Sequence, residues 1–99
     1  MSRRVAVEQA LRHLVPAIPR HEAGAVLDHA LGSPGLRTAT PEAAAWLSLV
    51  AYVRHALTEY EALLAEGYDA DSARFFVREE INIVLERWGA RRRLPEEDS

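Results

Sequence analysis

The sequence predicts an all-α protein, a compact bundle of four to five helices around one central apolar helix. Three observations lead to this prediction. Apolar residues recur at helical spacing in several segments, and no segment shows the alternation of a half-buried strand. Capping residues, prolines and glycines separate these segments. The first half of the stretch 40–67 is apolar on almost every side, which is typical of a helix surrounded by others.

Composition indicates one globular domain. The chain has 99 residues, 48% hydrophobic and 27% charged, which is enough for a single hydrophobic core. The sequence contains no cysteine, which excludes disulfides and thiolate metal sites. We expect residues 1–90 to form one helical domain and residues 91–99 to form a charged tail that frays. The N-terminus does not resemble a secretory signal, and the longest apolar run is far shorter than the roughly 20 residues that a membrane span needs. We therefore expect a cytoplasmic protein with no membrane contact.

The first two helices are expected over residues 2–15 and 20–31. Pro16 ends the first, and the loop that starts at Gly32 ends the second. Gly24 lies inside the second helix, where it costs up to about 1 kcal/mol relative to alanine, so it predicts close packing against a neighbour. The residues expected to face inward are Val7, Leu11, Leu14, Val15, Ala23, Val26, Leu27, Ala30 and Leu31.

The central helix is expected to begin after Thr40, which caps it ahead of a proline at its first position. Continued without a break to Gly67, the helix would be about 39 Å long. A compact domain of this size is only roughly 33 Å across. The segment from Thr58 to Glu61 matches the capping-box pattern, so we predict a kink or a new helix at Thr58, with Gly67 as its C-cap. The expected inward stripe is Trp46, Leu49, Val50, Val53 and Leu57, widened by Leu47 and Ala51 and followed by Tyr60, Leu63 and Leu64.

The last helix is expected over residues 72–88, capped by Asp69 or Asp71 and ended by Gly89. Its spacing predicts one apolar stripe and a second, smaller apolar face. The stripe comprises Val77, Ile81, Val84, Leu85 and Trp88, and the second face comprises Phe76 and Ile83.

The predicted break at Thr58 also holds the side chains that suggest chemistry. On a continuous helix, His55 and Glu59 would share a face and could both bind a metal. No third ligand follows at a recognised spacing, so we predict no metal and no cofactor. His55 tuned by Glu59 or Glu61 could act in acid–base catalysis, but no glycine-rich oxyanion or phosphate loop accompanies it. We favour a structural brace, in which Arg54 contacts Thr58 or Glu61. Whether the protein is an enzyme stays open, and we do not favour that hypothesis.

Two arginine clusters suggest nucleic-acid binding as an alternative. One comprises Arg3, Arg4 and Arg12, and the other comprises Arg87, Arg91, Arg92 and Arg93. The net charge of −3 opposes this reading, since residues 1–57 carry six arginines against four acids and residues 58–99 carry six against eleven. The acidic residues 96–98 follow the second cluster directly.

The stretch 40–89 resembles the bacterial and fungal family catalogued as domain of unknown function 2293. The residues that carry the resemblance are Arg54, His55, Thr58, Tyr60, Leu63, Leu64, Gly67, Ala73, Arg74, Val77, Leu85 and Trp88. The chain has Glu61 where the family pattern has aspartate. The resemblance implies no reaction or ligand. It implies that six residues act as one constellation, namely Arg54, His55, Thr58, Tyr60, Glu61 and Arg74.

These observations lead to three functional hypotheses. The first is a non-catalytic helical module that binds a protein partner or itself, as in a homodimer, because the chain is small, carries two tryptophans and three tyrosines and lacks a complete catalytic set. The second is nucleic-acid binding through the arginine clusters. The third is a metal-dependent hydrolase centred on His55 and Glu59.

Overall fold

The computed structural model describes residues 1–96, and this part of the chain is helical without strands. The elements are α1 (Arg3–Leu14), α2 (Arg20–Gly32), the 3₁₀ helix η1 (Pro34–Leu36), α3 (Pro41–Leu57), α4 (Tyr60–Ala65) and α5 (Ala70–Arg87). The molecule measures 43 × 28 × 28 Å along its principal axes. The prediction of an all-α fold with four to five α-helices is therefore confirmed. None of the helices in the described part is both long and apolar enough to cross a membrane.

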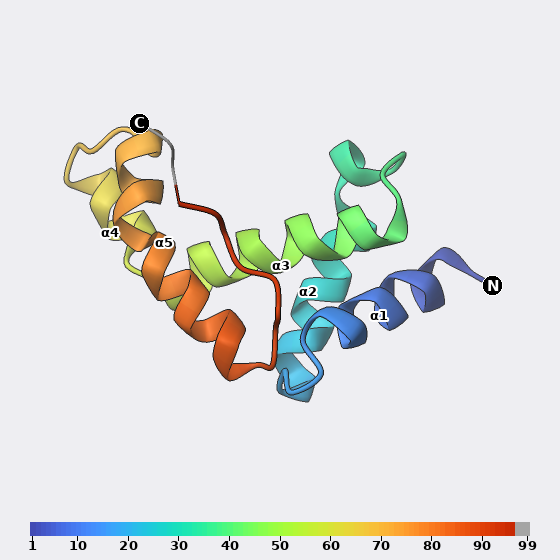
Figure 1. The fold of residues 1–99 in the computed structure, drawn as a ribbon. Coiled ribbons are helices and arrows are strands. Elements are labelled where there is room, and N and C mark those ends of the chain that lie inside the picture. Colours follow the sequence, from blue (N-terminus) through green and yellow to red (C-terminus); the bar gives the residue numbers. More distant parts are fainter. Residues whose placement is uncertain (97–99) are drawn as a thin grey trace.

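Helix α3 is the central element. Helices α1 and α2 pack on each other and on α3, while α4 and α5 pack on each other and on α3 (Figure 1). Leu49 and Val53 of α3 are fully buried, so the apolar stripe predicted for this helix forms the middle of the core. Leu47 and Leu57 were wrongly placed in that stripe, because they are 52% and 41% exposed.

Three helices begin at side-chain caps. The Ser2 hydroxyl accepts from the Val5 amide at 3.2 Å, and the Thr40 hydroxyl accepts from the Ala43 amide at 3.1 Å. The Asp69 carboxylate accepts from Ser72 N at 2.8 Å, so Asp69 is the cap of α5. Each cap satisfies an amide that has no partner inside its helix. The caps predicted at Thr40 and Asp69 are confirmed.

The glycines differ in what their positions require. Gly67 and Gly89 have φ values of +103° and +88°, a backbone conformation that favours glycine, and each lies two residues after the end of its helix, α4 or α5. Gly24 shows no such need, since a Cβ atom there would meet nothing within 4 Å. The close packing predicted at Gly24 is therefore absent.

The chain after α5 turns back across α3 toward the beginning of α5 (Figure 1). Leu94 packs against the core and forms two hydrogen bonds with the buried side chain of Asn82. The Arg92 guanidinium lies 4.0 Å from the Trp46 ring centroid. The tail from Arg92 to Leu94 thus differs from the expectation of fraying, because Asn82 and the core offer it partners. The rest of that predicted tail, residues 97–99, lies outside the described residues.

Candidate functional site

The break between α3 and α4 lies at Thr58, as predicted. The Thr58 hydroxyl donates to the carbonyl oxygen of Arg54 and accepts from the Tyr60 amide at 3.2 Å. One side chain therefore satisfies a carbonyl at the end of α3 and an amide at the start of α4. The predicted capping box is wrong in its partner, because Glu61 does not reach back to Thr58 and instead contacts His55.

His55 and Glu61 bridge the break on the outside of the molecule. His55 Nδ1 forms a hydrogen bond with Glu61 Oε1, and both side chains are more than half exposed. The His55 ring also meets Tyr60 edge-on, with centroids 5.2 Å apart. Tyr60 is only 4% exposed, so it fixes the ring of His55 against the core. The pair joins the last turn of α3 to the first turn of α4.

The Arg54 guanidinium also lies against the Tyr60 ring. It is 5.7 Å from the Tyr60 ring centroid, a cation–π geometry. Burial and the positive charge of Arg74 lower the pKa of Arg54 from its ordinary value. The predicted brace between Arg54 and Thr58 exists, but it uses the Arg54 carbonyl rather than its side chain. The guanidinium is therefore free for another role.

Three arginines meet in one pocket beneath the tail. Arg54 at the end of α3 and Arg74 and Arg78 of α5 line a cavity of about 210 Å³. Leu94 and Pro95 complete its wall. Arg78 is absent from the predicted constellation. Arg78 could have been identified from the sequence, because it follows Arg74 by four residues and therefore lies on the same face of the helix.

Exposed aromatic rings adjoin this pocket. Phe75 lines it and lies under Arg78, whose guanidinium is 5.1 Å from the ring centroid. Phe76 contacts Phe75 and Tyr68 edge-on, with centroids 5.9 and 5.4 Å apart. Phe75 and Phe76 are each 50% exposed, and Ile83 is 49% exposed, so the second apolar face predicted for this helix lies at the surface. We call Tyr68, Phe75 and Phe76 the aromatic surface.

The structure brings four of the six predicted constellation residues together in two pairs, and one member of each pair contacts the buried Tyr60 ring. His55 and Glu61 are hydrogen-bonded to each other, and Arg54 and Arg74 line the pocket beneath the tail. Glu59 belongs to neither pair. Because α3 ends at Leu57, Glu59 does not share a continuous helix with His55. Across the described residues, no group of three or more histidine and acidic side chains could hold a metal ion.

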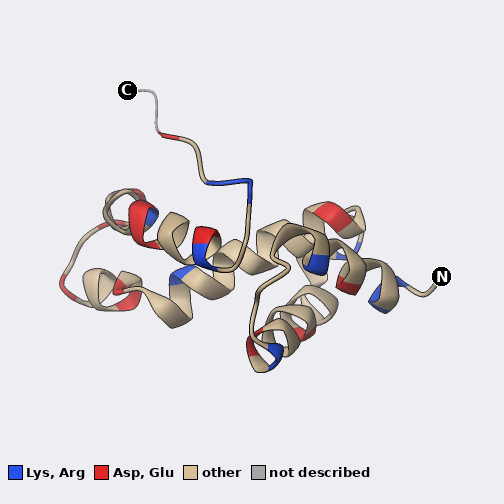
Figure 2. Ribbon diagram, turned by 60° about the horizontal axis from the view of Figure 1, so that its bottom comes forward, with Lys and Arg blue, Asp and Glu red and all other residues tan. Residues whose placement is uncertain are grey.

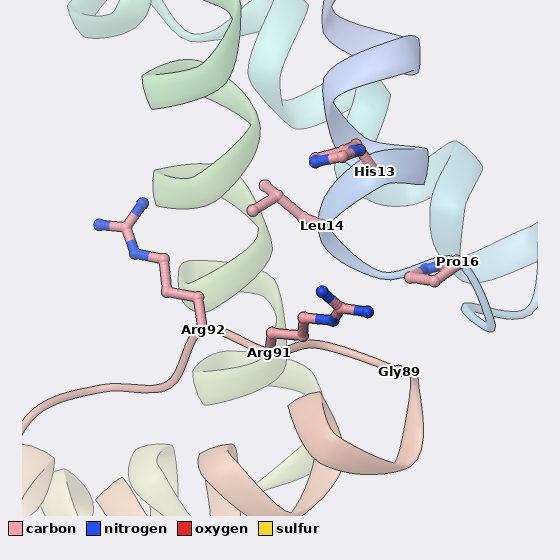
Figure 3. Close-up of a pocket in the computed structure, with 6 residues that line it drawn as sticks. All are labelled: His13, Leu14, Pro16, Gly89, Arg91 and Arg92. Carbon is pink, nitrogen blue, oxygen red and sulfur yellow. The ribbon is translucent and has the colours of Figure 1, made fainter.

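The arginines proposed for nucleic-acid binding lie on α1 and at or after the end of α5. Figure 2 shows basic positions distributed over several helices and the tail. Arg3 donates to the Leu36 carbonyl at 2.8 Å, Arg12 lies 3.9 Å from Glu8, and Arg93 lies 3.4 Å from Glu79. Arg91 and Arg92 line a cavity of about 400 Å³ with His13, but their side chains point in different directions (Figure 3). Arg4 is exposed.

Fold and site together define a small all-helical domain with a hydrogen-bonded pair across the break between α3 and α4 and an arginine pocket beneath the tail. The chain belongs to the family described as uncharacterized conserved protein (DUF2293), which matches residues 10–89. The resemblance to domain of unknown function 2293 is confirmed. The matched segment begins nearer the N-terminus than the stretch 40–89 on which the resemblance was based. No curated protein and no solved structure matches the chain.

Proposed function

We propose that this domain is a non-catalytic module that binds a protein partner through the aromatic surface at the start of α5. The half-exposed pair Phe75 and Phe76 carries the proposal. Aromatic side chains supply much of the binding energy in protein interfaces because they bury a large area at little entropic cost. The proposal keeps the expected cytoplasmic location.

Charge beside the aromatic surface indicates the kind of partner. Arg78 lies over Phe75, and Arg54 and Arg74 line the adjoining pocket. A partner segment that combines apolar side chains with an anionic group would complement both features.

A capture experiment with matched variants tests the proposal. The tagged protein, Phe76→Ser and the control Leu47→Ser are compared for the proteins they retain from extracts, and the retained partner is then purified and titrated by calorimetry. Leu47 is a suitable control because it is equally exposed but lies on α3. We expect purified partner to bind the protein and Leu47→Ser alike and to bind Phe76→Ser at least about tenfold more weakly, the loss typical of an interface hot spot.

Two results would contradict the proposal. One is a purified partner whose affinity is the same for the protein and Phe76→Ser. The other is a protein that light scattering shows to dimerise through this surface, with dimerisation lost in Phe76→Ser, because the partner would then be a second copy.

A further inference from the structure

The arginine pocket holds positive charge without an internal counter-charge. The ion pairs formed within residues 1–96 join Arg12 to Glu8, His55 to Glu61 and Arg93 to Glu79, so none includes an arginine of the pocket. The positive charge of Arg74 acts on Arg54 and, together with burial, lowers the pKa of Arg54. Like charges held close together destabilise each other, which makes a bound anion favourable there.

Two nitrogen atoms of the pocket arginines are also buried without a partner. Arg54 Nε and Arg78 Nη1 have no hydrogen-bond acceptor in the described part of the chain. Buried donors are nearly always paired, and each unpaired charged donor has a specific explanation when it occurs in a folded protein. An anion that entered the pocket would supply the acceptor that these donors lack.

We propose that Arg54, Arg74 and Arg78 bind a single phosphate monoester group carried by the protein partner, an inference that rests on the proposed function. A carboxylate has two oxygens and is satisfied by one bidentate arginine. A phosphate monoester carries close to two negative charges and three acceptor oxygens, which match three guanidinium groups from two helices. The cavity of about 210 Å³ accepts one such group.

The surroundings of the pocket favour a phosphorylated protein over a nucleic acid. Affinity for a polynucleotide requires a track of cations that contacts many phosphates. The pocket is instead bordered by Phe75 and by Leu94 and Pro95, which are apolar. The next arginine along the tail, Arg93, already contacts Glu79. One phosphate beside apolar side chains is the pattern of a phosphorylated peptide.

An NMR titration tests this inference on the isolated protein. The arginine Nε–Hε resonances are followed while a short phosphoserine peptide, its unphosphorylated form and its glutamate form are added in turn. We expect a saturable shift of the Arg54 resonance with the phosphoserine peptide alone. Arg74→Gln should weaken binding about tenfold, because it removes one charge-assisted contact. The control Arg20→Gln, on the exposed start of α2, should leave the affinity unchanged.

Four results would overturn the inference. They are the absence of a saturable shift, an equal response to the glutamate peptide, tighter saturation by a single-stranded oligonucleotide, and binding of inorganic phosphate as tight as that of the peptide. The titration needs no partner, so its failure leaves partner binding through Phe76 standing. Conversely, failure of the capture experiment leaves the phosphate titration interpretable.

Discussion

Asn82 and Leu94 hold the C-terminal segment on α5 through a pair of hydrogen bonds. The Leu94 amide donates to Asn82 Oδ1 at 2.7 Å, and Asn82 Nδ2 donates to the Leu94 carbonyl at 3.2 Å. The Asn82 side chain is buried, so both of its polar ends are satisfied by one residue of the tail. The same anchor places Leu94 and Pro95 over the arginine pocket.

Asn82→Ala should destabilise the protein. The substitution removes two hydrogen bonds and leaves the Leu94 amide and carbonyl without their partner, so we expect the free energy of unfolding to fall by about 1–3 kcal/mol. Urea denaturation measures this change. The control Glu86→Ala, one turn later on the exposed face of α5, should change it by less than about 0.5 kcal/mol. Equal effects of the two substitutions would show that the anchor contributes no stability.

The break at Thr58 should depend on its hydroxyl group. Thr58→Ala removes the bond to the Arg54 carbonyl and the bond from the Tyr60 amide, so we expect a loss of about 1–2 kcal/mol in unfolding free energy. Thr58→Ser retains the hydroxyl and should recover most of this loss. Chemical denaturation of the two variants checks the prediction, and equal stabilities would contradict it.

The local features of the fold could be predicted from sequence because neighbouring residues determine them. A cap needs only a side-chain oxygen and an amide three residues on, which is why Thr40 and Asp69 could be identified. The break at Thr58 could be located because a threonine there can cap a new helix, and its hydroxyl does accept from the Tyr60 amide. The size argument for the break was wrong, since a helix of about 39 Å would fit along the 43 Å axis of the molecule. Leu57 was misplaced because the helix ends there and its side chain no longer follows the stripe.

The candidate site depends on contacts between distant segments, and periodicity carries no information about them. Arg54 meets Arg78 only because α5 folds back on the end of α3. In the sequence, Asn82 is a polar residue within a helical segment, and its neighbours in the chain do not indicate that it pairs with Leu94. Glu61 had three possible partners within reach, Arg54, His55 and Thr58, and only the geometry of the turn selects His55.

Gly89→Ala should destabilise the protein, whereas Gly24→Ala should stabilise it. Gly89 has a φ of +88°, and a Cβ atom there would lie 3.2 Å from Pro16 Cγ. A non-glycine residue in this conformation costs about 1–2 kcal/mol before any contact is counted. Gly24 lies inside α2 with open space around it, so alanine should add about 0.5–1 kcal/mol. Thermal unfolding measures the stability of both variants. Shifts of the same sign in the two unfolding temperatures would contradict the prediction.

The cap of α5 should make stability depend on acid pH. The bonds from Ser72 to the Asp69 carboxylate lower the pKa of Asp69 from its ordinary value of 3.8. A group whose pKa is lower in the folded state contributes stability that is present above its ordinary pKa and is lost as the pH falls through the folded-state value. Stability conferred by Asp69 should therefore decrease as the pH falls below 3.8.

Asp69→Asn separates this titration from the capping bond itself. Asparagine accepts the same bond from the Ser72 amide but does not ionise, so the variant should remain close to the protein in stability near neutral pH. In acid, its unfolding midpoint should fall less steeply than that of the protein. Asp69→Ala has no cap, so at neutral pH it should be less stable than the unchanged protein and Asp69→Asn. As the pH falls and Asp69 becomes protonated, the stability of the unchanged protein should approach that of Asp69→Ala. Urea midpoints measured across the acid range check this, and parallel curves for the protein and Asp69→Asn would show that Asp69 does not contribute to the acid dependence.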